Sequence, residues 1–219
     1  EAAENFRIEG GFESLIAINK AMESPRQKLF ARINMAPEGT RTLVAMRGHL
    51  IELLPLQPEL KEVEFDLKNL FFSWFNKGFL ETRRIDWSSP ASVLEKLIDY
   101  EAVHAISGWG DLRSRLREDR RCFAFFHPSM PDEPLIFVEV ALVNGIADNV
   151  HDLLDEMAPA TDPDTADTAI FYSISNCQRG LAGVGFGDFL IKRVVDRLSQ
   201  RMPNVKTFAT LSPIPGFRK

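Results

Sequence analysis

Apolar side chains recur every three or four positions through the first eighty residues, which is the spacing of amphipathic helices. In the clearest case Leu60, Val63, Leu67 and Phe71 fall on one face. Prolines separate the segments, and Thr40 is the expected N-cap of the third. The predicted helices span residues 12–22, 26–33, 40–54 and 59–74. This region shows no pattern of catalytic residues, and we interpret His49 as a surface or interface side chain.

The remaining chain mixes predicted strands and helices. Ser89 as N-cap and Pro90 at the first helical position begin a helix. Two apolar runs joined by a proline-rich turn predict a β-hairpin. The predicted strands are 122–127, 135–142, 169–174 and 207–211, and the later helices are 111–120, 147–157 and 188–202. The fold class is therefore mixed α+β: a helical domain over residues 1–85 and a mixed β-sheet domain with flanking helices over residues 86–219.

A glycine-rich turn joins the strand at 169–174 to the helix at 188–202. Gly180, Gly183, Gly185 and Gly187 allow close approach to the backbone. Backbone N–H groups at a helix N-terminus attract phosphate, so the turn predicts a pyrophosphate cradle. A tight strand-to-helix connection without a ligand is the alternative. Neither GxGxxG, which fails at Asp188, nor the P-loop pattern fits.

Composition narrows the function class. The chain has 219 residues, 45% apolar and 26% charged, with a net charge of −5, which argues against nucleic-acid binding. No apolar run has the length of a membrane span, and no secretory signal pattern begins the sequence. Cys122 and Cys177 lie in no CxxC pair, so zinc is not indicated, and we expect reduced thiols. We expect a cytoplasmic protein, or an organellar matrix protein if the source is eukaryotic.

The spacing G-x-x-G-x-G, from Gly180 through Gly183 to Gly185, resembles the loop with which GNAT-superfamily acetyltransferases hold the pyrophosphate of coenzyme A. Four further segments sharpen the resemblance. From about Ser24 to its last residue the chain resembles the malonyl-CoA decarboxylase family, in HPSMPDEPL at 127–135, FYSIS at 171–175, FLIKRVV at 189–195 and LSPIPGF at 211–217.

This resemblance implies a GNAT-like acyl-CoA fold, in which the parallel strands 169–175 and 207–211 splay apart around the pantetheine. It implies that Ser212 is the catalytic serine of a serine–histidine pair. It also implies that the N-terminal helices carry subunit contacts of a homo-oligomer. The loop implied to bind the CoA phosphates consists of Ala182, Gly183, Val184, Gly185, Phe186, Gly187 and Asp188.

The implied reaction converts malonyl-CoA to acetyl-CoA and CO2. No metal or organic cofactor is required, because the thioester is itself the electron sink; only the coenzyme A moiety of the substrate is bound. Oxyanion-type donors and an acid of near-neutral pKa would assist it. The chain departs from the family twice. Gly185 stands where many relatives have an acidic residue, and the family's catalytic histidine is expected after Lys219, so the catalytic domain is expected to be truncated at its C-terminal end.

Other titratable residues keep two interpretations each. His104 is either a packed or capping histidine or a catalytic one. His127 either caps the hairpin turn or belongs to a functional site. Glu139 is either an outward-facing carboxylate or a general base in a cleft. His151 is expected on a surface helix. Two other functions stay open. One is acyl transfer from acyl-CoA to an amine, with a base such as Glu139 and a dispensable Ser212; the other is a non-catalytic CoA-binding module.

Overall fold

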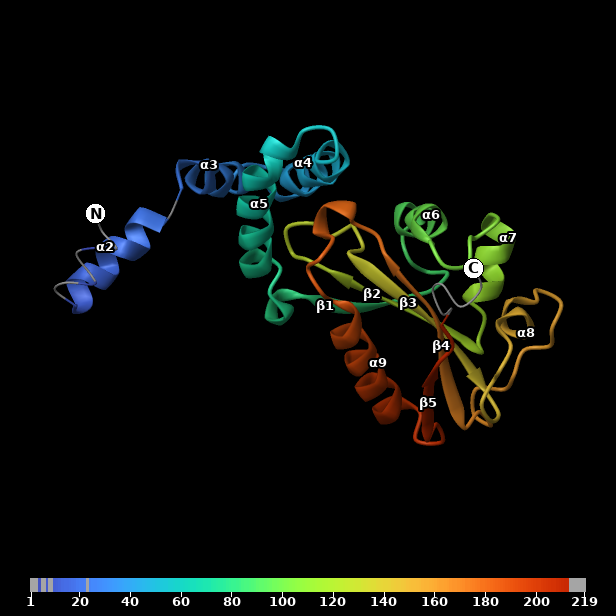
Figure 1. Cartoon of the computed structure of the whole chain (residues 1–219). Helices are drawn as coiled ribbons and strands as arrows, with labels where there is room; N and C mark the ends of the chain where they lie inside the picture. Colours follow the sequence, from blue (N-terminus) through green and yellow to red (C-terminus); the bar gives the residue numbers. More distant parts are fainter. Residues whose placement is uncertain (1–3, 5–6, 8–9, 23, 213–219) are drawn as a thin grey trace.

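The N-terminal part of the chain is helical. The computed structural model describes residues 4, 7, 10–22 and 24–212. Figure 1 shows α2 lying apart from the rest, followed by helices that pack on one another. The four helices predicted from the sequence are present, as α2 (Phe12–Met22), α3 (Pro25–Asn34), α4 (Gly39–Leu53) and α5 (Lys61–Trp74). Single 3₁₀ turns precede and follow α5, as η1 (Pro58–Leu60) and η2 (Lys77–Phe79).

The predicted N-cap role of Thr40 is wrong. The N-cap position of α4 is taken by Glu38, which adopts a left-handed φ of 57°, and the helix begins at Gly39. Thr40 lies inside the first turn, where its hydroxyl donates a hydrogen bond to Asn34 Oδ1 at 2.8 Å. A Cβ on Gly39 would lie 1.9 Å from the carbonyl oxygen of Ile33. The tight α3–α4 turn therefore fixes the helix start.

A five-stranded mixed sheet forms the second part, with strand order β1-β2-β3-β4-β5. The strands are β1 (Glu81–Ile85), β2 (Arg120–Phe126), β3 (Ile136–Val143), β4 (Thr168–Asn176) and β5 (Thr207–Thr210). The first four pair antiparallel, whereas β4 and β5 are parallel. The mixed α+β class, the β2–β3 hairpin and the parallel last pair are confirmed.

Strand β1 was not predicted from the sequence. Its segment ETRRI carries three charged residues among five positions, and the sequence pattern had placed it in a connection. It pairs with β2 from Glu81 opposite Phe126 to Ile85 opposite Cys122. Because β1 is the edge strand, its outer side chains stay in water, and charges there discourage pairing with another chain.

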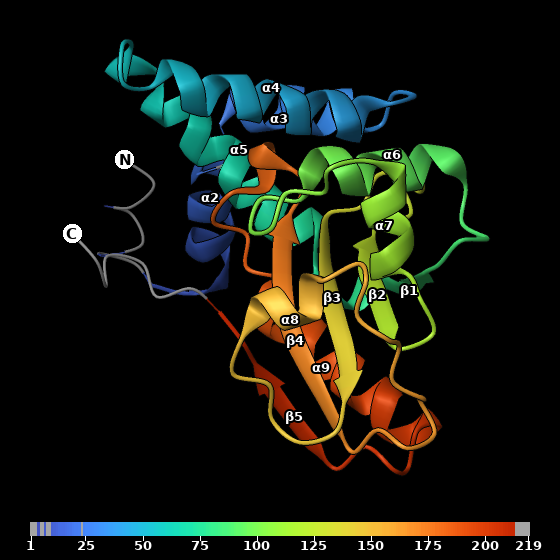
Figure 2. The ribbon, with the colours of Figure 1, turned by 90° about the vertical axis from the view of Figure 1, so that its right-hand side faces the viewer.

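Helices cover both faces of the sheet, with α9 on one face and α6, α7 and α8 on the other (Figure 2). Residues alternate between two cores along β3: Ile136 and Val138 face the core shared with α4, α5 and α9, whereas Phe137 faces α6 and α7. The bounds are α6 (Ala91–Tyr100), α7 (Trp109–Arg115), α8 (Val150–Leu154), η3 (Arg179–Leu181) and α9 (Gly187–Arg201).

Three details of these helices differ from the prediction. Pro90, and not Ser89, takes the N-cap position of α6, and the Ser89 hydroxyl accepts a hydrogen bond from the Asp86 N–H at 3.1 Å. Helix α6 ends at Tyr100, so His104 lies in the loop that follows. Helices α7 and α8 are shorter than predicted, because Arg120 belongs to β2 and only residues 150–154 form α8.

Candidate functional site

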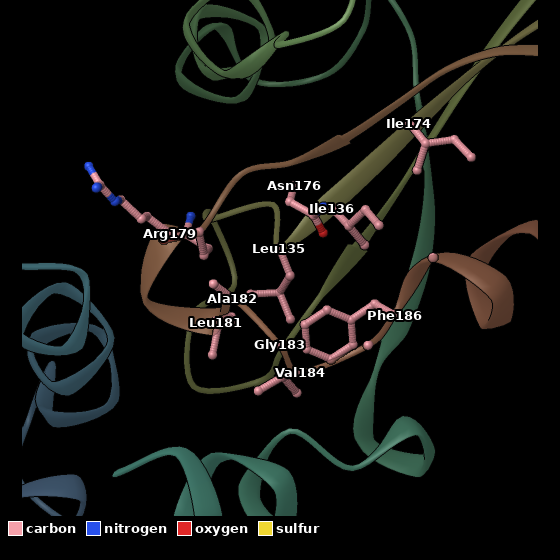
Figure 3. Close-up of a pocket in the computed structure, with 13 residues that line it drawn as sticks. Leu135, Ile136, Ile174, Asn176, Arg179, Leu181, Ala182, Gly183, Val184 and Phe186 are labelled. Atoms are coloured by element: carbon pink, nitrogen blue, oxygen red, sulfur yellow. The ribbon is translucent and has the colours of Figure 1, made fainter. Parts of the chain in front are cut away.

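The glycine turn between β4 and α9 lines a cavity of about 410 Å³. Residues 182–187 line it from one side, and Leu135, Ile136 and Ile174 from the sheet (Figure 3). Leu181, Val184 and Phe186 are buried in the core below the turn, and their packing holds the turn against the sheet and α5. Gly183 adopts a φ of 80°, a conformation that side chains disfavour. The turn is thus held by its apolar residues and bent by its glycines.

The backbone of this turn presents unpaired donors. Among the described residues, no backbone or side-chain acceptor binds the N–H groups of Gly183, Gly185, Phe186, Gly187 or Asp188. Gly187 and Asp188 also form the first turn of α9, where the helix dipole places partial positive charge. An exposed row of N–H groups at a helix N-terminus is an anion-binding arrangement. This part of the sequence interpretation has a geometric basis in the structure.

Gly180 does not belong to this row. It faces away from the cavity and packs on α4, where a Cβ would lie 1.8 Å from the Val44 carbonyl oxygen. The guanidinium of Arg47, also on α4, donates to the carbonyl oxygens of Gly180 and Ala182. The first glycine of the G-x-x-G-x-G spacing is therefore required by contact between α4 and η3.

The two charged residues of the turn point elsewhere. Arg179 forms an exposed ion pair with Glu52, and Figure 3 shows its guanidinium directed away from the cavity. Asp188 follows the cavity-lining residues, and its carboxylate lies 3.8 Å from Lys77 Nζ. Arg179 nevertheless lines the cavity with other parts of its side chain or backbone, whereas Asp188 does not line it.

Ser212 lies where β4 and β5 part. The parallel pairing ends at Phe171 opposite Thr210, and the last hydrogen bond runs from Leu211 N–H to Phe171 O at 2.9 Å. Ser212 follows at once and is exposed. It borders one cavity of about 180 Å³ with Val103, Ser173 and Ile174. The rest of the LSPIPGF segment, from Pro213, lies outside the described residues.

Ile174 connects the two sites. It lines both the cavity of the glycine turn and the smaller cavity beside Ser212. β4 therefore runs from one site to the other, and its residues 172–176 have no parallel partner on the β5 side. An extended ligand with an anionic end at the turn would reach Ser212 along this stretch of β4.

The sequence interpretation did not single out Glu101, which organises the loop beside Ser212. Its Oε1 accepts hydrogen bonds from the Ser173 hydroxyl at 2.7 Å and from the N–H groups of Val103 and His104 at 2.9 Å. Its Oε2 accepts from the Ser175 hydroxyl at 3.1 Å. The buried carboxylate thereby ties the segment after α6 to β4. Glu101 directly follows a helix, and nothing in its sequence context indicates two serines 72 and 74 positions away.

Glu139 is neither an outward carboxylate nor a base in a cleft. It is fully buried in β3, where Arg115 of α7 donates to its Oε2 at 3.1 Å. Burial, opposed by Arg115 and reinforced by the nearby Glu101, raises the pKa of Glu139 to about 8. Arg115 is itself buried and pairs with Asp111 as well.

The histidines occupy different positions. His127 caps the hairpin turn, since its Nδ1 accepts from the Ser129 N–H at 3.2 Å, and burial lowers its pKa. His49 is exposed on α4, as predicted. His104 and His151 both line a cavity of about 310 Å³ that Ser212 also borders. The ring Nε2 of His104 is buried there without a hydrogen-bond partner among the described residues.

Cys122 and Cys177 are free and buried, and burial raises the pKa of both thiols. Within the described part of the chain, no group of three or more His, Cys, Asp or Glu residues is arranged to hold a metal ion. The described helices include none that is both long and apolar enough to cross a membrane.

The fold and the turn define a mixed α+β protein in which, within the described residues, a row of unpaired N–H groups lies at a helix N-terminus. Comparison with models of known protein families gives a more specific identification. The model for the malonyl-CoA decarboxylase C-terminal domain matches residues 78–219, and that for the N-terminal domain matches residues 1–75. The chain belongs to the malonyl-CoA decarboxylase family.

Solved and curated relatives agree. The crystal structure of malonyl-CoA decarboxylase from Agrobacterium vitis is 52% identical, with a TM-score of 0.94 over 99% of this chain and 53% of that one. The enzyme from Rhodopseudomonas palustris is 51% identical, with a TM-score of 0.91 and the same coverage. The mitochondrial malonyl-CoA decarboxylases of Anser anser anser and Rattus norvegicus are 43% and 41% identical over 90% and 89% of this chain. This chain spans only 40% and 41% of their lengths.

Proposed function

We propose that this chain forms the substrate-binding part of a malonyl-CoA decarboxylase, which converts malonyl-CoA to acetyl-CoA and CO2. The observation that carries the proposal is the row of unpaired N–H groups at the glycine turn, whose cavity shares Ile174 with the cavity beside Ser212. Membership of the family supplies the reaction, and this geometry supplies a path for a CoA thioester between the two sites.

In the proposed complex the loop of residues 182–188 binds the CoA phosphates through its unpaired N–H groups, those of Gly183 and of residues 185–188, together with the positive end of the α9 dipole. The pantetheine follows β4 past Ile174, where β5 no longer pairs. The thioester then lies beside Ser212. The wall of this path along Ile136 and Ile174 is apolar.

Decarboxylation breaks the bond between the carboxylate and the α-carbon. The electron pair enters the thioester, which becomes an enolate, and a proton then adds to carbon to give acetyl-CoA. The Ser212 hydroxyl is proposed to donate a hydrogen bond to the charge that develops in this step. One such preorganised donor typically contributes about 3–4 kcal/mol to a transition state.

The histidine partner of Ser212 is proposed to lie in the family polypeptide beyond residue 219. The relatives are about twice as long as the aligned chain, which leaves room for it. His104 and His151 share a cavity with Ser212, but no described hydrogen bond joins either ring to the serine. No metal or organic cofactor enters the proposed reaction, because the thioester accepts the electron pair.

The test measures CO2 release from malonyl-CoA, and CoA binding by calorimetry, for this chain and for a full-length family protein that contains it. We expect the full-length protein to bind CoA and release CO2, and this chain to bind CoA without turnover. A full-length protein that binds CoA but releases no CO2 from malonyl-CoA would refute the proposed decarboxylase activity. Full activity in this chain would instead refute the proposal that the catalytic histidine lies beyond residue 219. His104 and His151 would then be the next residues to mutate.

The acyltransferase alternative has less support. It needs a general base in an acceptor cleft, and its sequence candidate Glu139 is fully buried against Arg115. A non-catalytic CoA-binding module would show CoA binding without CO2 release in the full-length protein as well, so that the same experiment separates it.

We also propose that the N-terminal helices make subunit contacts in a homo-oligomer. Phe12 is 73% exposed, and Leu15 and Ile16 are exposed beside it on α2. Apolar side chains gathered on one helix commonly mark an interface. Sedimentation of this chain with and without Phe12→Ser would test it, and a monomeric wild type would refute it.

The named goose and rat relatives are mitochondrial; a cytoplasmic or matrix location for this chain belongs to the proposal.

A further inference from the structure

Arg47 joins the helical region to the glycine turn across 133 residues of sequence. Its side chain is 2% exposed, and its Nη1 donates to Gly180 O at 2.6 Å and to Ala182 O at 3.0 Å. Glu64 of α5 accepts from its Nε and Nη2 and so balances the buried charge. One planar guanidinium therefore satisfies two turn carbonyls and one carboxylate, a task for which the lysine ammonium has the wrong shape.

This contact determines where a turn donor points. In a trans peptide the C=O and N–H groups point in opposite directions. Because Arg47 binds the Ala182 carbonyl, the N–H of the same peptide unit, which belongs to Gly183, is directed away from α4. That N–H has no acceptor among the described residues, and Gly183 lines the cavity of the turn. Arg47 thus holds the peptide in the orientation that an anion in this cavity needs.

A cation from the same helical region lies beside this peptide. A Cβ on Gly183 would lie 3.2 Å from both Cε and Nζ of Lys68 on α5. Lys68 is partly buried, and in the part of the chain that the structure describes its ammonium has neither a carboxylate partner nor a hydrogen-bond acceptor. An unneutralised ammonium next to an unpaired N–H is the usual surrounding of a bound phosphate.

We infer that helices α4 and α5 complete the phosphate site of the glycine turn: Lys68 binds the phosphate, and Arg47 is a positioning residue that orients the Gly183 peptide toward it. The helical region then has a role in ligand binding besides the proposed subunit contacts. This inference rests on the proposed function, because it takes the phosphates to be those of CoA.

The test compares four proteins by calorimetry: wild type, Lys68→Gln, Arg47→Lys and Lys61→Gln. Lys61 is the matched control, being an exposed lysine two turns earlier on α5. The probes are CoA, inorganic pyrophosphate and pantetheine, which has no phosphate. We expect Lys68→Gln to weaken CoA and pyrophosphate about tenfold, as loss of one charge-assisted contact does. Pantetheine binding and the unfolding midpoint should not change, and Lys61→Gln should match wild type throughout.

Arg47→Lys should weaken CoA and pyrophosphate by at least as much. A fifth protein, Glu64→Gln, keeps the guanidinium and should weaken them less than Arg47→Lys does. If Arg47→Lys does not fold, Glu64→Gln alone should still weaken pyrophosphate more than Lys61→Gln does. Unchanged CoA and pyrophosphate affinity in Lys68→Gln would overturn the inference while leaving the proposed function intact. Pyrophosphate binding that depends on Lys68 in a full-length protein without decarboxylase activity would support the inference and refute the function.

Discussion

Arg115 on α7 and Glu139 on β3 meet inside the protein, with Arg115 Nη1 donating to Glu139 Oε2 at 3.1 Å. The two side chains are 6% and 1% exposed. Arg115 also pairs with Asp111, Nε to Oδ1 at 2.8 Å, so its charge is already balanced when Glu139 carries a proton. Ionised Glu139 would add a second buried negative charge next to Asp111, and burial disfavours that charge. The carboxyl of Glu139 therefore keeps a pKa of about 8 although it lies beside an arginine.

The contribution of Glu139 to stability should therefore fall as pH rises from 5 to 8. In the unfolded chain Glu139 loses its proton near its ordinary pKa of 4.5, whereas in the folded chain it keeps the proton up to about pH 8. The folded state binds more protons in this window, so the free energy of unfolding decreases with pH, by at most about 1.4 kcal/mol per pH unit. Urea unfolding at pH 5, 6, 7 and 8 measures this slope.

Glu139→Gln is the control for this pH dependence. The amide keeps the shape and can accept from Arg115, but it does not titrate, so the variant should gain stability relative to wild type as pH rises. His127, whose pKa is lowered, titrates in both proteins and cancels in the difference. Parallel curves for the two proteins between pH 5 and 8 would contradict the raised pKa. Arg115→Met should destabilise at pH 7 by about 3–5 kcal/mol, because it strands Asp111.

Gly180→Ala should separate the turn from α4. The new Cβ would lie 1.8 Å from the Val44 carbonyl oxygen, which is backbone and cannot rotate away. We expect a loss of about 1–3 kcal/mol in stability, as for other overpacked sites, and weaker CoA binding because η3 directly precedes Ala182, whose carbonyl accepts from Arg47. Denaturant unfolding and calorimetry measure both effects.

Gly110→Ala provides the comparison. Gly110 lies in α7 with open space around its Cβ position, so alanine should stabilise the helix by about 0.5–1 kcal/mol. It lies outside the residues that line the cavity of the turn, and CoA affinity should stay at the wild-type value. Equal effects of the two substitutions would argue against the steric reason for glycine at position 180.

The sequence predicted those elements whose apolar spacing is regular. Helices α5 and α9 and strands β2 to β5 present continuous apolar faces, and all were predicted within a few residues. Strand β1 was missed because ETRRI has no apolar alternation; it forms by pairing with β2, a contact between residues about 40 positions apart. Local pattern cannot show a strand that depends on a distant partner.

The candidate site also has one part that the sequence predicted and another part that it did not. The glycine turn was visible in the sequence because its residues are contiguous; its N–H groups at Gly183 and at residues 185–188 are unpaired among the described residues, and the anion site at this turn stays a prediction. The contacts of Arg47, Lys68 and Glu101 were not predicted, since they reach the turn or β4 across more than 70 residues. An arginine or glutamate on a predicted helix is ordinarily solvated, and only tertiary packing shows that these are buried.

Ser212→Ala in the full-length protein should abolish CO2 release and leave CoA binding almost unchanged. The hydroxyl lies beyond the last β4–β5 hydrogen bond and makes no contact with the glycine turn, so that its loss affects the reacting end of the substrate only. We expect kcat to fall at least about 100-fold, the effect of removing one oxyanion donor, with an unchanged calorimetric affinity for CoA.

The two histidines that share a cavity with Ser212 provide the decisive comparison. If the partner histidine lies beyond residue 219, His104→Gln and His151→Gln should each keep kcat within a few fold of wild type. His104→Gln is the more informative, because its buried Nε2 has no described partner and the amide preserves a donor and an acceptor there. A kcat loss in either variant as large as that of Ser212→Ala, with an alkaline limb missing from the pH–rate profile, would place the catalytic histidine inside this chain.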